Sequence, residues 1–240
     1  MTDANPFALA EFRDNPERRC PVVLVLDTSA SMRGEAIRQL NAGLQQLARD
    51  LQDDPLASLR VELAIVSFGG RVSTIDVREG RGHSIAADPV VAFVTVDAFK
   101  PPTLRASGDT PMGAAVWQGL ELIRGRKSLF KEGGVPYFRP WLFLISDGAP
   151  TDPDWSQAAE AARLEESVNG VSVFPIGVDR ADLGTLGMFS SQRGPALLSN
   201  IHGFQRLFQW LSESLAAVAN SRPGEIVTLP AAGWAQIDPT

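Results

Sequence analysis

The fold is decided by residues 22–32, Val22-Val23-Leu24-Val25-Leu26-Asp27-Thr28-Ser29-Ala30-Ser31-Met32. Five apolar residues, mostly β-branched or leucine, open this stretch and predict a strand buried on both faces. The strand ends at Asp27, and hydroxyl side chains follow at Ser29 and Ser31. A buried carboxylate needs a partner, and a small hard cation such as Mg²⁺ is bound by oxygens of this kind. The stretch therefore predicts a cation site at the end of a buried strand.

The composition is that of a water-soluble globular protein. At 240 residues the chain can form one large domain, and we expect a polar lead-in over 1–19, the domain over 20–220 and a tail over 221–240. The net charge of −6 argues against nucleic acid as a partner. Cys20 is the one cysteine, so neither an internal disulfide nor a zinc cluster is expected. With no signal peptide and no membrane span in the sequence, we expect a cytoplasmic protein that does not contact membrane.

Helical and strand patterns alternate along the chain. Apolar residues spaced by three and four predict a helix over 37–51, and further helices are predicted from Pro111, over 154–168 and over 204–218. Apolar runs predict strands over 61–68, 72–77, 90–96, 141–146 and 171–178, with a hairpin through Gly69 and Gly70. Thr110 or Asp109 is expected to cap the helix that starts at Pro111.

This alternation predicts an α/β fold of the doubly wound, Rossmann-like kind. We expect a mainly parallel central sheet with one antiparallel edge strand, formed by the hairpin, and helices on both faces. Ligands of such sheets bind beyond the carboxyl ends of the strands. Asp27 and Asp147 both follow predicted strands at that edge, and Thr110 stands at a helix entrance.

Five side chains are therefore expected to converge. They supply two carboxylates and three hydroxyls and are Asp27, Ser29, Ser31, Thr110 and Asp147. Two carboxylates neutralise a divalent cation, and an octahedral Mg²⁺ retains coordination positions for other oxygens. The alternative is that these side chains form a helix-capping network that holds no metal.

The constellation resembles the von Willebrand factor A domains, which carry a metal-ion-dependent adhesion site (MIDAS) built from Asp-x-Ser-x-Ser, Thr and Asp elements. The resemblance covers about residues 20–220. It implies Mg²⁺ or Mn²⁺ as the cofactor, with Ser29, Ser31 and Thr110 as ligands directly or by exchange with water. It also implies that Asp27 and Asp147 act largely through water, and that a protein partner supplies an Asp or Glu to the metal.

Three segments resemble the TerY-like branch of bacterial tellurium-resistance proteins in particular. They are Gly-Asp-Thr-Pro-Met-Gly (108–113), Gly-Val-Pro-Tyr-Phe-Arg-Pro-Trp (134–141) and Ser-Asp-Gly-Ala-Pro-Thr-Asp (146–152). This resemblance implies a stress-response setting in which the partner is a kinase or phosphatase from the same operon. Some members of that branch carry a C-terminal metal-binding ribbon, for which this chain lacks the cysteines.

Enzymatic readings of the sequence are less well supported. A metal-dependent phosphoester hydrolase is the alternative, because haloacid-dehalogenase-type enzymes also place an Asp after their first strand. Those enzymes use a second Asp two residues later, where this chain has Ser29. The histidines, His83 and His202, have no base or nucleophile partner that the sequence reveals. We therefore expect an interaction module rather than an enzyme.

A basic cluster follows the helix that starts at Pro111, with Arg124, Arg126, Lys127 and Lys131. Such clusters are most often solvated helix faces. The alternative is that this cluster guides an acidic partner to the protein.

Overall fold

The computed structural model describes residues 15, 17–198, 203–221, 229 and 236–237 of the chain. The predicted lead-in over 1–19 and tail over 221–240 thus lie largely outside the described residues. The strands are β1 (Cys20–Asp27), β2 (Val61–Gly69), β3 (Arg71–Ile75), β4 (Ser84–Ile85), β5 (Val94–Thr95), β6 (Trp141–Ser146), β7 (Ser172–Val178), β8 (Ala196–Leu198) and β9 (Gln236–Ile237).

The helices alternate with these strands as the sequence predicted. They are α2 (Glu35–Asp53), α3 (Pro55–Arg60), α4 (Pro89–Ala92), α5 (Met112–Glu132), α6 (Trp155–Ser167), α7 (Leu183–Gly187) and α8 (Gly203–Asn220), with 3-10 turns η1 (Ala30–Met32) and η2 (Val96–Ala98).

The described strands form one sheet in the order β4-β3-β2-β1-β6-β7-β8-β9, and β5 also pairs with β2. Strand β1 is central and pairs in parallel with β2 on one side and β6 on the other. The parallel part continues through β7 to β8. The predicted mainly parallel α/β fold is confirmed.

Antiparallel pairing is more extensive than the single edge strand that we expected. Strand β3 does form the predicted hairpin with β2 through Gly70, whose φ of 72° suits glycine. Strand β4 then pairs with β3, so β3 is not the edge. Strands β5 and β9 add antiparallel pairs to β2 and β8. Short strands such as these follow no detectable alternation, so the apolar pattern did not reveal them.

The strand predicted over 90–96 is wrong. Pro89 instead opens α4, and the Asp88 carboxylate accepts a hydrogen bond from the Val90 N–H at 2.7 Å. A proline at the first helical position with an Asp cap favours a helical turn over a strand. Only residues 94–95 of the predicted run form a strand, β5.

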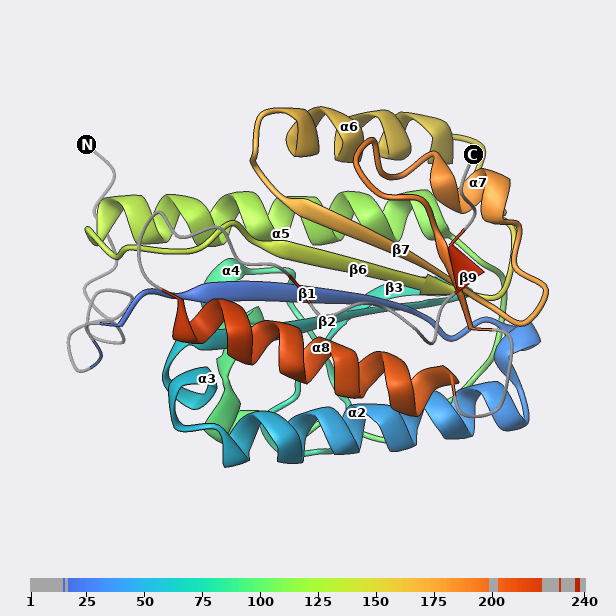
Figure 1. Ribbon diagram of the computed structural model, residues 1–240. Helices are drawn as coiled ribbons and strands as arrows, with labels where there is room; N and C mark the ends of the chain where they lie inside the picture. The colour runs from blue at the N-terminus through green and yellow to red at the C-terminus, as the bar shows by residue number, and fades with distance from the viewer. Residues whose placement is uncertain (1–14, 16, 199–202, 222–228, 230–235, 238–240) are drawn as a thin grey trace.

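Helices cover both faces of the sheet (Figure 1): α2 and α8 lie on one face, and α5 and α6 on the other. Alternate residues of β1 divide between the two cores. Leu24 and Leu26 pack with α2 and α8, whereas Val23 and Val25 pack with α5 and α6. Both faces of β1 are fully buried, as the uninterrupted apolar run predicted.

An aromatic cluster attaches α8 to the sheet. Phe143 of β6 and Phe174 of β7 stack with ring centroids 4.5 Å apart, and Trp210 of α8 meets both rings edge-on. Contacts of this kind add to the free energy of burial. The cluster fixes α8 over β6 and β7, and β6 is one of the two strands whose ends carry the predicted site.

Candidate metal centre

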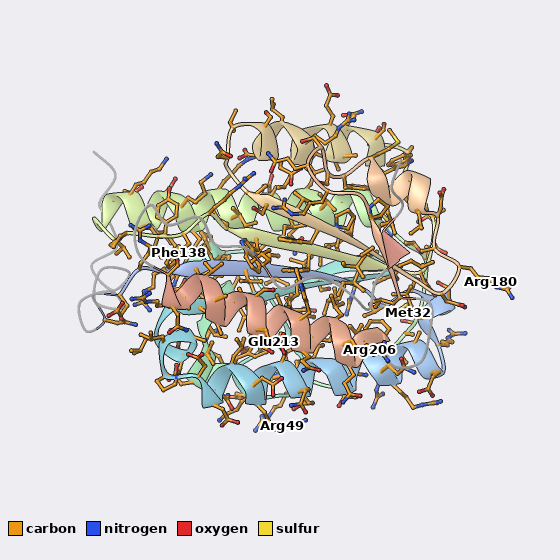
Figure 2. The ribbon with its side chains drawn as sticks, viewed as in Figure 1. Met32, Arg49, Phe138, Arg180, Arg206 and Glu213 are labelled. Atoms are coloured by element: carbon orange, nitrogen blue, oxygen red, sulfur yellow. The ribbon has the colours of Figure 1, made fainter. Side chains whose placement is uncertain are left out.

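The sheet topology brings the two predicted carboxylates to one edge. Strands β1 and β6 are neighbours and parallel, with Leu26 paired to Ile145. Asp27 is the last residue of β1, and Asp147 directly follows β6. The backbone that follows Asp27 turns through η1, which ends at the buried Met32, and Figure 2 shows Met32 at this edge of the sheet.

A chain of hydrogen bonds links three of the predicted residues. The hydroxyl oxygens of Ser29 and Ser31 are 2.9 Å apart, and the Ser31 hydroxyl donates to Asp147 Oδ1 at 2.7 Å. The loops after β1 and β6 are therefore joined through side-chain oxygens alone. Oxygens in such contact are close enough to share one cation, which is the arrangement that a metal site requires.

Asp27 lies behind this chain and is completely buried. Its Oδ1 accepts a hydrogen bond from the Ser29 N–H at 2.7 Å, and its Oδ2 accepts one from the Ser146 hydroxyl. Within the described residues, neither Asp27 nor Asp147 forms an ion pair. One buried and one half-buried carboxylate at the same edge, neither with an ion pair among the described residues, fit a site for a positive ion.

Thr110 approaches the same point from the entrance of α5. Gly148, the residue after Asp147, has no side chain; a β-carbon there would lie 3.6 Å from Thr110 Oγ1 and 3.8 Å from Ser31 Oγ. The glycine thus leaves open the space between these two hydroxyls. All five predicted residues therefore come together, and their oxygens match the preference of Mg²⁺ or Mn²⁺.

Both carboxylates have a pKa above the ordinary aspartate value. Burial is the main cause for Asp27, and hydrogen bonds from Ser146 and Ser29 oppose it in part. Burial also raises the pKa of Asp147, and the nearby negative charge of Asp179 raises it further. A bound divalent cation favours the ionised forms, since an opposite charge nearby lowers a carboxyl pKa.

Sequence reasoning missed the residues that position Thr110. The Thr110 N–H donates to Thr151 Oγ1 at 3.1 Å, and the Thr151 N–H donates to the Thr110 carbonyl at 2.9 Å. The next residue, Asp152, accepts hydrogen bonds from the N–H groups of Gly113 and Ala114 at 3.2 and 2.9 Å. Asp152 is thus the cap of α5, and the expected cap at Thr110 or Asp109 is wrong.

Helix α5 begins at Met112, one residue later than predicted, with Pro111 flanking it. A cap supplied from 38 to 39 residues away cannot be identified from local spacing. The one sequence signal for this cap was Asp152 itself, the acidic residue at the end of the segment 146–152. Ser146, which donates to Asp27, belongs to the same segment and was likewise not among the predicted site residues.

The basic cluster lies within α5, and only Lys131 of its four cations is an exposed residue. Arg126 is buried, and its Nε donates to the buried Glu62 at 2.7 Å. Arg124 and Lys127 pair with Glu165, at 2.7 and 3.9 Å. These three cations pair with acidic residues of this chain, which leaves Lys131 as the member of the cluster that is exposed and has no ion pair among the described residues.

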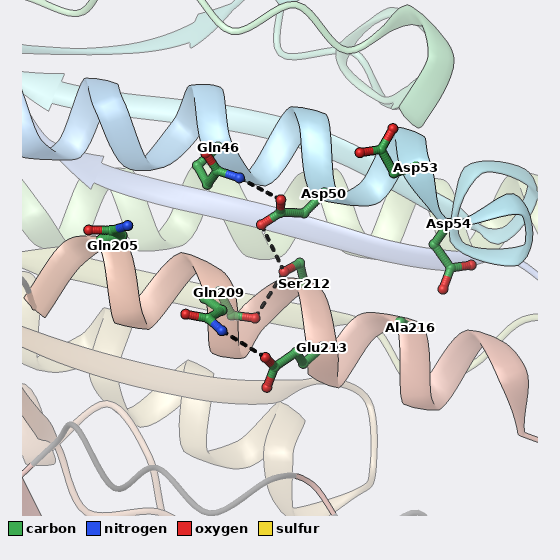
Figure 3. A pocket seen from close by; sticks show the side chains of 9 residues that line it. All are labelled: Gln46, Asp50, Asp53, Asp54, Gln205, Gln209, Ser212, Glu213 and Ala216. Carbon is green, nitrogen blue, oxygen red and sulfur yellow. Dashed lines mark hydrogen bonds between the residues drawn. The ribbon is translucent and has the colours of Figure 1, made fainter.

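A separate groove of about 490 Å³ lies between α2 and α8 (Figure 3). It is lined by several acidic side chains, but its polar groups largely satisfy one another. The Asp50 carboxylate accepts hydrogen bonds from Gln46 and Ser212, and Gln209 donates to Glu213. None of the five predicted metal ligands lines this groove.

These observations define a class: an α/β protein whose parallel sheet carries a hydroxyl-rich and carboxylate-containing site at its carboxyl edge. Consistent with a site made mainly of hydroxyls, the described residues contain no group of three or more His, Cys, Asp or Glu side chains placed to hold a metal. The chain belongs to the von Willebrand factor type A domain family, whose family model matches residues 22–210. The matched region contains all five predicted ligands.

Solved structures of low sequence identity share the fold. A von Willebrand factor type A protein from Catenulispora acidiphila is 14% identical with a TM-score of 0.56, over 83% of this chain and 43% of that one. BatB from Bacteroides thetaiotaomicron is 16% identical with a TM-score of 0.52, over 84% and 100%. The pilus adhesin SpaC from Lactobacillus rhamnosus GG is 13% identical with a TM-score of 0.59, over 85% and 31%.

This chain thus spans less than half the length of two of these three proteins. A search of curated protein sequences found no significant match. Among the described residues, no helix is both long enough and apolar enough to cross a membrane.

Proposed function

We propose that this protein is an intracellular interaction module that binds Mg²⁺ or Mn²⁺ at the MIDAS-like site and engages an acidic residue of a protein partner through the metal. The observation that carries the proposal is the buried Asp27, which accepts a hydrogen bond from the Ser29 N–H and has no cationic partner among the described residues. Ser29, Ser31 and Thr110 would hold the ion, and Asp27 and Asp147 would balance its charge. The ion itself would supply a coordination position for an external carboxylate.

The family and fold support an interaction role, since one structural relative is a pilus adhesin. The resemblance of three segments to the TerY-like branch leads us to propose further that the partner is a kinase or phosphatase in a bacterial stress-response or tellurium-resistance system. Affinity capture from the source cells, with Mg²⁺ and with EDTA, tests this identification. A kinase or phosphatase recovered only with Mg²⁺ supports it.

Metal binding is tested by thermal unfolding with increasing Mg²⁺ or Mn²⁺. At a ligand concentration 100 times its Kd, a bound ion stabilises the folded state by about 2.7 kcal/mol. For a chain of this size that corresponds to a rise in Tm of roughly 5–10 °C. The rise is expected for the wild type and to vanish for Asp27→Ala.

Asp97→Ala is the matched control, because Asp97 is an exposed residue of η2 and not part of the site. It is expected to respond to the metal as the wild type does. Equal stabilisation of Asp27→Ala and the wild type would refute the site assignment. The hydrolase alternative is tested on the same proteins, since it requires metal-dependent turnover of p-nitrophenyl phosphate that is lost in Asp27→Ala.

A further inference from the structure

A second cavity, of about 590 Å³, lies beside the metal centre. Three arginines line it, Arg71 of β3 with Arg81 and Arg105 from two loops, and we call it the arginine cavity. Most of its other lining residues are serine, threonine or glycine, and none of the described lining residues is acidic. In a chain with a net charge of −6, such a concentration of positive charge favours an anionic ligand.

The arginines are available to bind such a ligand. Within the described part of the chain, Arg71 and Arg105 are exposed and have neither an ion pair nor a side-chain hydrogen bond. Arg81 has Glu79 at 3.4 Å, a pair in which both side chains are more than half exposed. Exposed pairs of this kind are weak, so Arg81 can exchange Glu79 for another carboxylate at little cost.

The wall of the cavity is held in place by the rest of the fold. Asn41 of α2 donates to the Leu104 carbonyl at 3.0 Å and accepts from the Leu104 N–H at 2.8 Å. Gln45, one helical turn further, donates to the Pro101 carbonyl. A loop fixed at these points loses little conformational entropy on binding.

The arginine cavity and the metal centre share backbone. Thr28 lies between Asp27 and Ser29 and also lines the cavity. Its carbonyl accepts from the Ser107 N–H at 2.7 Å, and the Ala30 N–H donates to the Gly108 carbonyl at 2.9 Å. A chain segment bound at the metal therefore has the cavity next to it.

We propose that the arginine cavity binds an acidic peptide segment of the partner, adjacent to the residue that reaches the metal. This inference rests on the proposed metal-dependent interaction and extends it from one acidic residue to an acidic stretch. Small-molecule pockets of this volume are mostly apolar, whereas only Ile75 and Leu104 are apolar here. Arginines on three separate segments suit several carboxylates along an extended chain better than a single small ion.

The probe for this proposal is a fluorescein-labelled octaglutamate peptide, followed by fluorescence anisotropy with Mg²⁺ at about 10 mM salt, where screening is weak. Arg71→Gln/Arg105→Gln is expected to weaken binding about two- to thirtyfold. The control variant, Arg49→Gln/Arg163→Gln, removes the same charge from α2 and α6, outside the cavity. A cavity variant that binds within twofold of this control would overturn the proposal.

Two further arms separate this proposal from the metal-dependent function. In EDTA, or with Asp27→Ala, the difference between the cavity variant and its control is expected to persist. If that difference persists while Mg²⁺ has no effect on the wild type, the cavity stands and the metal-dependent interaction fails. If Mg²⁺ strengthens binding but the cavity variant binds as its control does, the metal-dependent interaction stands and the arginine-cavity proposal fails. Loss of inorganic phosphate binding in a cavity variant that still binds octaglutamate normally would identify a small-anion site and refute the peptide assignment.

Discussion

Replacing Arg126 by methionine tests the buried ion pair at the opposite end of the sheet from the candidate metal centre. Arg126 and Glu62 are 1% and 0% exposed, and the Arg126 Nε lies 2.7 Å from Glu62 Oε2. The guanidinium also packs over the rings of Phe93 and Phe130, with centroid distances of 5.5 and 5.2 Å. Methionine preserves much of this apolar contact, so the main loss is the charge that faces Glu62.

The expected loss in the free energy of unfolding depends on the positive charge that remains beside Glu62. Arg19 lies 3.6 Å from the other carboxylate oxygen and compensates part of the lost charge. Removing one partner of a buried pair costs about 3–5 kcal/mol, and the presence of Arg19 places the expected loss near the lower value. About 3 kcal/mol is a large share of the 5–15 kcal/mol that stabilises a typical domain. It corresponds to a fall in Tm of roughly 6–12 °C.

Urea unfolding, followed by tryptophan fluorescence and circular dichroism, measures this loss. Arg124→Met is the matched control, because the Arg124–Glu165 pair is partly exposed and is expected to contribute at most about 1 kcal/mol. The loss of stability in the double variant Arg126→Met/Glu62→Gln is expected to be about 0.5–3 kcal/mol smaller than the sum of the losses in the two single variants. A loss below about 1 kcal/mol for Arg126→Met, or simple additivity in the double variant, would refute the reasoning.

Three other substitutions test the cap of α5, a helix contact and a buried carboxylate. Asp152→Ala removes two hydrogen bonds from the start of α5, so we expect a loss of about 0.5–2 kcal/mol in the free energy of unfolding. We also expect a smaller rise in Tm with Mg²⁺. An unchanged rise would show that the cap does not support the candidate metal site. Gly43→Ala places a β-carbon 2.2 Å from a ring carbon of Phe208. Urea unfolding is therefore expected to show a loss of about 1–3 kcal/mol in the free energy of unfolding. An unchanged free energy of unfolding would contradict this close approach of α2 and α8. Glu166 is buried, which by itself raises its pKa, but hydrogen bonds from Val173 and residues 190–192 outweigh burial and hold the pKa below the ordinary value. A depressed carboxyl pKa adds stability that is present above the unfolded-state pKa and is lost as the pH falls below about 4.5. The stability advantage of the wild type over Glu166→Gln is therefore expected to shrink on acidification. An advantage that grows on acidification would contradict this.

The long elements and the convergence of the five predicted site residues were predictable because their signals are local. The uninterrupted apolar run of β1 indicated a strand buried on both faces, and the leucine spacing of α2 marked its buried stripe. The position of Asp27 and Asp147 directly after strands was enough to place both at the carboxyl edge of a parallel sheet. The structure brings Ser29, Ser31 and Thr110 to the same edge.

What the sequence did not reveal depends on contacts between distant residues. The Asp152 cap of α5 and the hydrogen bond from Ser146 to Asp27 join segments that are 38 and 119 residues apart. The burial of Arg126 is also a tertiary effect, since a cationic run on a helix resembles a solvated face until Glu62 is placed opposite it. The arginine cavity is formed by residues from four separate segments, so no single motif contains it.

The central position of β1 has a consequence for synthesis of the protein on the ribosome. Ser146, whose hydroxyl meets Asp27, is made 119 residues after it, which is roughly 6–24 s at 5–20 residues per second. During that interval the edge of β1 that will pair with β6 has no strand beside it, and an unpaired apolar edge is prone to aggregate. The parallel pairing between β1 and β6 thus leaves this edge of β1 open to pairing with other chains until β6 has been made.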